Sequence, residues 1–164
     1  MSRRRPVLVS LAVLVLAVVA WRYWVPDDKR DVRRRLNAFA AEFNETTAAG
    51  LATIAHAARI GTYFTEDVVV EFGDGAPPIR GRKTLIAMAT RLQPRTSAFT
   101  LELLDQNVTI SAPSTAEVNV TAAFRRRSRV AGEDAVEARE LALRMVKTGG
   151  NWLVSEVKAV ETFK

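Results

Sequence analysis

The stretch YFTEDVVVEFGDGAPPIRGRKTLIAMATRL, residues 63–92, decides the fold of this chain. The apolar run 68–72 predicts a short strand, and the glycines and prolines of 73–78 predict a turn. Leu85, Met88, Ala89 and Leu92 then recur at helical spacing, and we expect Pro94 to end that helix. A strand that passes through a turn directly into a helix predicts a mixed α+β domain.

Two more helices are predicted before this stretch. Residues 28–44 place apolar side chains on one face of a helix, and a second apolar stripe predicts a helix that ends near Gly61. The first stripe consists of Val32, Leu36, Phe39, Ala40 and Phe43, and the second of Leu51, Ile54, Ala55 and Ala58. We expect both stripes to face the core.

After Pro94 the sequence predicts only strands. Leu101 and Leu103 alternate with polar residues, but Val108 resumes on the opposite parity, which indicates a bulge. A similar change of parity separates Ala138 from Leu141. Long antiparallel strands with bulges predict a strongly bent sheet, which three amphipathic helices would cover.

This order of elements resembles the nuclear transport factor 2-like superfamily, including its polyketide-cyclase-like and ketosteroid-isomerase-like branches. The resemblance covers residues 30–164. Its most specific parts are YFTEDVVV at 63–70, IRGR at 79–82 and the closing GGNW at 149–152. It implies a cone-shaped domain, with three helices packed on a bent antiparallel sheet, in which Gly81 lets the backbone turn into the third helix.

The resemblance also implies where catalytic groups would lie. In the isomerase branch an Asp follows a Glu in the first strand and acts as the base, but Phe72 follows Glu71 here. The first helix offers Phe39 and Phe43 where that branch carries an oxyanion-donating Tyr. Both roles are therefore unfilled, and we expect no catalytic site and no isomerisation.

Five residues are candidates for lining the cone: His56, Tyr63, Phe72, Phe124 and Met145. We expect Phe72 to pack inside it. His56, the only histidine, has two interpretations: a base in a pocket, or a partly exposed residue opposite the apolar stripe of its helix, which we favour. Glu71 and Asp67 are expected to form strand-end ion pairs with Arg80 or Arg82. No grouping with metal-ligand spacing is evident, so we expect neither a metal nor a cofactor.

The first residues predict a membrane anchor. Residues 1–5 form a basic tail, and residues 6–26 are almost wholly apolar, about the length that a bilayer requires. The span ends in Trp21, Arg22, Tyr23 and Trp24, which suit the membrane interface. A cleaved signal peptide is the alternative, because small residues at 18–20 offer a cleavage site. We favour the anchor, followed by a domain over residues 27–164.

The net charge of +6 comes from separated clusters without interleaved aromatic residues, which argues against nucleic-acid binding. One cluster, expected at a hairpin tip, offers a contact for lipid headgroups or an acidic protein: Arg125, Arg126, Arg127 and Arg129. The chain has no cysteine, which excludes disulfides and thiolate metal sites.

Three hypotheses for function follow. We favour a non-catalytic accessory or assembly subunit of a membrane protein complex, anchored in a bacterial inner membrane with its domain in the periplasm. The second is a module that binds a small apolar ligand, and the third is an enzyme that uses His56, Tyr63 and Glu71. We also expect that the outer face of the sheet is able to form a homodimer.

Overall fold

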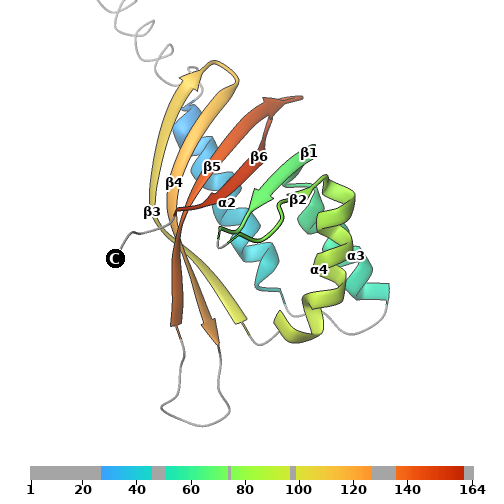
Figure 1. Ribbon diagram of the computed structural model, residues 1–164. Helices are drawn as coiled ribbons and strands as arrows, with labels where there is room; N and C mark the ends of the chain where they lie inside the picture. The colour runs from blue at the N-terminus through green and yellow to red at the C-terminus, as the bar shows by residue number, and fades with distance from the viewer. Residues whose placement is uncertain (1–26, 46–50, 74, 97–98, 127–135, 161–164) are drawn as a thin grey trace, which may run out of the picture.

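The computed structural model describes residues 27–45, 51–73, 75–96, 99–126 and 136–160. In this part of the chain three helices lie against a curved sheet of six strands in the order β2-β1-β6-β5-β4-β3 (Figure 1). The predicted α+β architecture with three helices on a curved sheet is thus confirmed, but the sheet is not wholly antiparallel as expected, because β1 pairs with β6 in parallel. The predicted tail and anchor, residues 1–26, lie outside the described residues, and no described helix has the length and apolar character to cross a bilayer.

The elements follow the predicted order along the chain, except that the two-residue strand β2 was not predicted. The helices are α2 (Asp28–Phe43), α3 (Leu51–Gly61) and α4 (Arg82–Thr96). The strands are β1 (Phe64–Glu71), β2 (Ile79–Arg80), β3 (Phe99–Ala112), β4 (Thr115–Arg126), β5 (Val136–Thr148) and β6 (Asn151–Ala159). β1 starts four residues earlier than expected, and α4 continues past Pro94 by two residues.

Helix α2 is fixed to the sheet at both ends. At its start Asp27 caps the backbone N–H of Arg30, and Lys147 of β5 donates a 2.7 Å hydrogen bond to Asp28. At its end the Asn44 amide both donates to and accepts from the backbone of Leu101 in β3, at 2.9 and 2.7 Å. These contacts hold the apolar face of α2 against the sheet.

The long strands contain the bulge that the sequence predicts in β3. The register of the β3–β4 pairing shifts between Leu104 and Asn107, where Asp105 has a φ of 51°. This bulge explains why Val108 resumes on the other parity and remains buried.

The second change of parity has a different cause. β5 pairs with β4 in unbroken register from Val136 to Val146, so the expected bulge between Ala138 and Leu141 is absent from that ladder. Val136 and Ala138 lie on the exposed face, and Leu141 begins the inward face. Apolar residues change faces in the part of β5 that continues past the end of α2 (Figure 1).

The connection from β1 to α4 forms as predicted. Val70 pairs with Ile79 across the turn, and Gly81, with a φ of 85°, donates its N–H to the Val68 carbonyl at 2.8 Å. A positive φ of this size favours glycine, so Gly81 allows the chain to leave β2 and enter α4.

Apolar side chains fill the space between α2 and the sheet. Met145, Val32 and Val68 have no exposed surface, and Trp152 is 2% exposed. A smaller cluster of Ala40, Leu101 and Ala122 continues the core toward the end of α2. The concave face of the sheet is therefore packed by hydrocarbon and aromatic groups.

Candidate functional site

The five predicted cone residues have different environments. Met145 is fully buried, while Tyr63 and Phe124 are half-buried and pack at the margin of the core. Phe72 is 46% exposed, so the expectation that it packs inside the cone is wrong. Alternation along β1 would direct residue 72 inward with Val68 and Val70, but the strand ends at Glu71 before that position.

An aromatic row connects the half-buried residues. Phe39 of α2 contacts Phe43, Tyr63 and Phe64, with ring centroids 5.6 to 6.3 Å apart. Phe43 in turn contacts Phe124 of β4 at 6.4 Å. Tyr63 is covered from its other side by the Arg35 guanidinium, 4.1 Å from the ring centroid. The Tyr63 ring is thus held between Phe39, which packs against it, and the cationic side chain of Arg35.

Helix α3 faces the opposite way from the prediction. Its apolar stripe is turned outward, with Leu51 85% and Ile54 55% exposed. Its buried residues are His56, Ala57 and Gly61. Gly61 lies against Ile86 of α4, where an added Cβ would come within 2.5 Å of Ile86 Cδ1. At Gly61 the two helices therefore approach too closely for a larger side chain.

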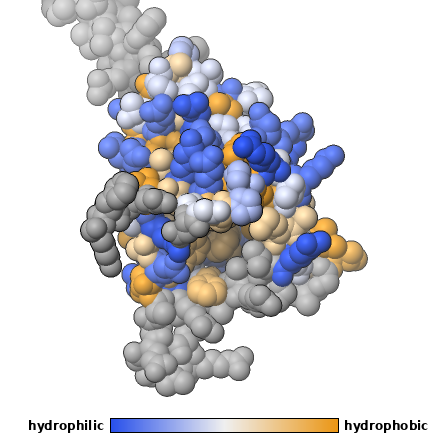
Figure 2. Space-filling view, in the orientation of Figure 1, coloured by the Kyte–Doolittle hydropathy of each residue, from blue (hydrophilic) through white to orange (hydrophobic). Residues whose placement is uncertain are grey.

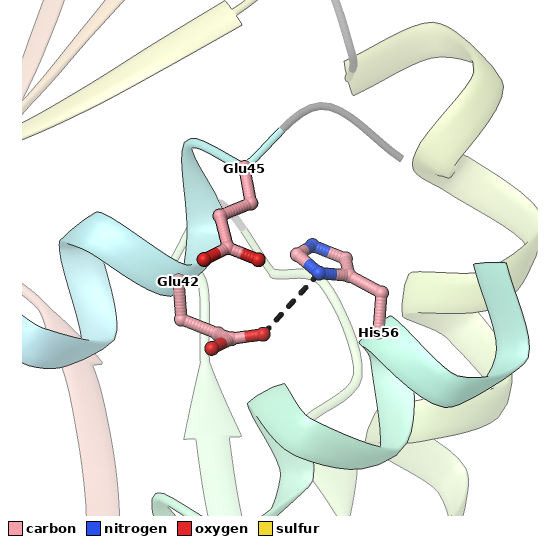
Figure 3. Close-up of side chains that lie close together, drawn as sticks. All are labelled: Glu42, Glu45 and His56. Carbon is pink, nitrogen blue, oxygen red and sulfur yellow. Dashed lines mark ion pairs between the residues drawn. The ribbon is translucent and has the colours of Figure 1, made fainter. Parts of the chain in front are cut away.

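His56 is consequently 3% exposed, which corrects the favoured interpretation that it is a surface residue. Its imidazole points toward the end of α2, where Glu42 and Glu45 project toward it (Figure 3). His56 Nδ1 lies 3.4 Å from Glu42 Oε1, and one ligand atom from each of the three residues falls within 4.8 Å of the others. The expectation that no such grouping exists is wrong.

Sequence spacing did not reveal this group for two reasons. Glu42 lies in the last turn of α2 and Glu45 follows its C-cap, whereas His56 lies in α3. Residues 46–50 separate these two parts of the sequence. The inverted orientation of α3 then turns the histidine inward. The only indication in the sequence was that His56 is a polar residue within a largely apolar helix.

Arg59 occupies the centre of this cluster. Its Nε contacts Glu42 Oε1 at 2.5 Å, and its Nη2 lies 3.2 Å from Glu45 Oε2 and 3.3 Å from His56 Nδ1. The hydrogen bond from Arg59 to Glu42 and the charges of both carboxylates raise the pKa of Arg59 above its usual value. Glu42 and Glu45 together carry two negative charges, of which Arg59 balances one.

The predicted ion pairs form with other partners. Arg82 contacts Glu66 at 3.0 Å, whereas Glu71 lies 3.9 Å from Lys158. Lys158 also contacts Glu156 at 2.8 Å, and this hydrogen bond lowers the pKa of Glu156. Glu71 thus has a surface ion pair, as favoured, but with Lys158 in place of Arg80 or Arg82.

The basic cluster is described only in part. Arg125 lies near the end of β4, 55% exposed, and its Nε is 3.3 Å from Glu102 on β3. Arg126 is the last residue of β4, while Arg127 and Arg129 lie outside the described residues, as do Trp21, Arg22, Tyr23 and Trp24.

Comparison with known proteins identifies the fold family. The SnoaL-like domain family matches residues 46–158, which include α3, α4, the strands β1 to β5 and all of β6 but its last residue. The chain belongs to the SnoaL-like family. No curated protein matches the sequence.

Solved structures of this fold are similar in shape although distant in sequence. A putative scytalone dehydratase from Novosphingobium aromaticivorans has a TM-score of 0.67 at 13% identity, covering 83% of this chain and 85% of its own. An NTF2-like protein with a cystatin-like fold from the same organism has a TM-score of 0.66 at 16% identity, covering 88% of both chains. A ketosteroid isomerase-like protein from Erwinia carotovora atroseptica has a TM-score of 0.58 at 13% identity, covering 83% of this chain and 98% of its own.

These similarities establish that the SnoaL-like domain shares the nuclear transport factor 2-like fold. At such identities they establish nothing about the chemistry of this chain. SnoaL-like domains include ligand-binding members and isomerase- or hydratase-like members, so function must be argued from the residues of the site.

Proposed function

We propose that this SnoaL-like protein is a non-catalytic accessory or assembly subunit of a larger membrane protein complex. It is held by residues 6–26 in a bacterial inner membrane, and its domain contacts other proteins in the periplasm. The observation that carries the proposal is the apolar packing of the concave face, where Val32, Val68 and Met145 have no exposed surface.

The residues that would supply chemistry support the same proposal. Phe72 stands at the expected base position and lies on the surface after β1. His56, Tyr63 and Glu71, the candidates for an enzyme, each have a separate partner: Glu42, Arg35 and Lys158. Catalysis by a general base requires a group within hydrogen-bond reach of a bound substrate. We therefore propose that the chain is not an enzyme.

Two surfaces are available for protein contact. The basic tip begins at Arg125, and the exposed side of α3 presents Leu51 and Ile54. Apolar surface gathers at the right-hand edge of the molecule in Figure 2, where α3 lies in Figure 1. Exposed apolar side chains next to charged ones are typical of protein-contact surfaces.

The outer face of the sheet is the surface that we propose for a homodimer. It carries charges of alternating sign on three adjacent strands, where Glu117 stands opposite Arg144 and Arg144 opposite Glu156. Such a ladder is able to pair with a second copy placed in the reverse direction.

A second candidate function is the binding of a small apolar ligand. The observation in its favour is the half-buried aromatic row, in which Phe43 and Phe124 pack beside Leu103 and Leu141 at the margin of the core. A ligand that displaces these rings from one another would enter between α2 and the sheet.

The test is extraction of the full-length chain from native membranes in mild detergent, followed by affinity purification at low and high salt. The proposal predicts that the chain sediments with membranes after an alkaline wash and that other proteins co-purify with it. Recovery of a soluble chain that begins near Trp21, without associated proteins, would contradict it. Turnover of a 3-oxosteroid by the purified chain would favour the enzyme instead.

A further inference from the structure

The cluster of Glu42, Glu45 and His56 has a donor set that none of the proposed roles uses. Carboxylate oxygens and an imidazole nitrogen are ligands that Zn²⁺ accepts in proteins, with three protein ligands leaving one position open. His56 is the only histidine and the chain has no cysteine. Any zinc site of this chain that uses an imidazole or thiolate ligand must therefore include His56.

The distance between His56 and Glu42 fits a metal better than a hydrogen bond. Nδ1 and Oε1 are 3.4 Å apart, beyond the usual 2.7 to 3.2 Å of an N–H···O hydrogen bond. Two ligands of a tetrahedral zinc ion, each at about 2.05 Å, are separated by about 3.3 Å. The two least exposed members of the cluster thus already have the spacing of two zinc ligands.

The present contacts of His56 Nδ1 also exclude one another. Arg59 donates to Nδ1 at 3.3 Å only if that nitrogen carries no proton, whereas Glu42 would require a proton on it. At most one of the two contacts is a hydrogen bond in any tautomer. The tautomer that accepts from Arg59 has an unprotonated Nδ1, and an unprotonated imidazole nitrogen is the form that binds a metal.

Arg59 holds the place that the cation would take. It contacts all three donor residues, but its side chain is 48% exposed and can withdraw into solvent. Glu45, whose side chain is 59% exposed, has room to move inward, while Glu42 at 16% and His56 at 3% are held by packing. Replacing the single charge of Arg59 by a divalent cation would neutralise both carboxylates.

We propose that Glu42, Glu45 and His56 form a zinc site that joins the end of α2 to α3, with Arg59 as the competitor that occupies it when no metal is bound. Coordination across the two helices would restrain the connection between them. The site lies in the helix layer and is independent of whether the chain has a protein partner.

The test uses the full-length, tag-free chain in detergent, stripped with a chelator and titrated with ZnCl₂ by calorimetry. We expect one zinc ion per chain, a rise in melting temperature that grows with free zinc, and d–d absorption of a tetrahedral site when Co²⁺ replaces zinc. Glu42→Gln and Glu45→Gln should each weaken binding by more than about tenfold. Arg59→Gln should strengthen it, because the competing cation is gone.

Glu156→Gln is the matched control, since it removes a carboxylate from an ion pair on β6 and should leave zinc binding unchanged. Glu45 is exposed, so its variant keeps the fold and gives a result even if Glu42→Gln is unstable. Absence of zinc binding to the wild-type chain would overturn the proposal. Binding that Glu45→Gln leaves intact, or that Arg59→Gln weakens, would overturn it as well.

Discussion

Replacing Leu51 and Ile54 together with alanine should lower the free energy of unfolding by only about 1 kcal/mol. Full burial of a leucine or isoleucine side chain stabilises a protein by about 1.5 to 3 kcal/mol. Leu51 is 85% exposed and Ile54 is 55% exposed, so most of that contribution is missing from the folded state. The small cost follows directly from the outward orientation of the α3 stripe.

The measurement is denaturant unfolding of the purified chain in detergent, followed by circular dichroism. Ala57→Asp is the control on the inward face, because Ala57 is 1% exposed and burial of an unpaired carboxylate costs several kcal/mol. If the stripe packed against the core, the double variant would lose about 4 kcal/mol or more. That result, together with a neutral Ala57→Asp, would show that α3 is rotated from its described orientation.

Three further predictions concern the core, the surface charges and the basic tip. Met145→Ala should lower the free energy of unfolding by about 2 to 5 kcal/mol because Met145 is fully buried, whereas Phe72→Ala should lower it by less than about 1 kcal/mol. Comparable decreases for the two variants in denaturant unfolding would contradict the packing. Lys158→Met should raise the pKa of Glu156, which an NMR titration measures. Because the folded state lowers that pKa, the ion pair stabilises the fold at pH values above the unfolded-state pKa, and the variant should lose less stability on acidification. An unchanged pKa of Glu156 would exclude the contact. Serine at the arginines of 125–129 should leave the melting temperature nearly unchanged but reduce co-purification of partners at low salt, and undiminished co-purification would exclude the tip as a contact.

The sequence predicted the fold because its signals were local. Gly81 marked the turn into α4, the parity change around Asp105 marked a real bulge, and the apolar stripe of α2 faced the core. Each of these features depends on residues that are close in the sequence. Hydrophobic periodicity therefore sufficed for element order and fold class.

The errors arose where tertiary contacts decide the outcome. In α3 the close approach of Ile86 to Gly61 requires glycine on the inner face at that position, while Leu51 and Ile54 face outward. Phe72 follows the pattern of β1, but the strand ends one residue before it. Neither result depends on periodicity within one element.

The candidate site was the least predictable feature. Glu42 and His56 meet only because α2 and α3 are packed together, and spacing along the chain gives no sign of that contact. Arg59 would have suggested ordinary surface charge, since arginine is common at the end of a helix.

Native mass spectrometry of the full-length chain, released from detergent after extraction from its own membranes, tests the central claim most directly. The proposed function predicts assemblies in which the intact chain is bound to other protein chains, without the added mass of an organic ligand. A chain or homodimer that carries a small apolar ligand, without other proteins, would contradict the proposed function and support a ligand-binding module.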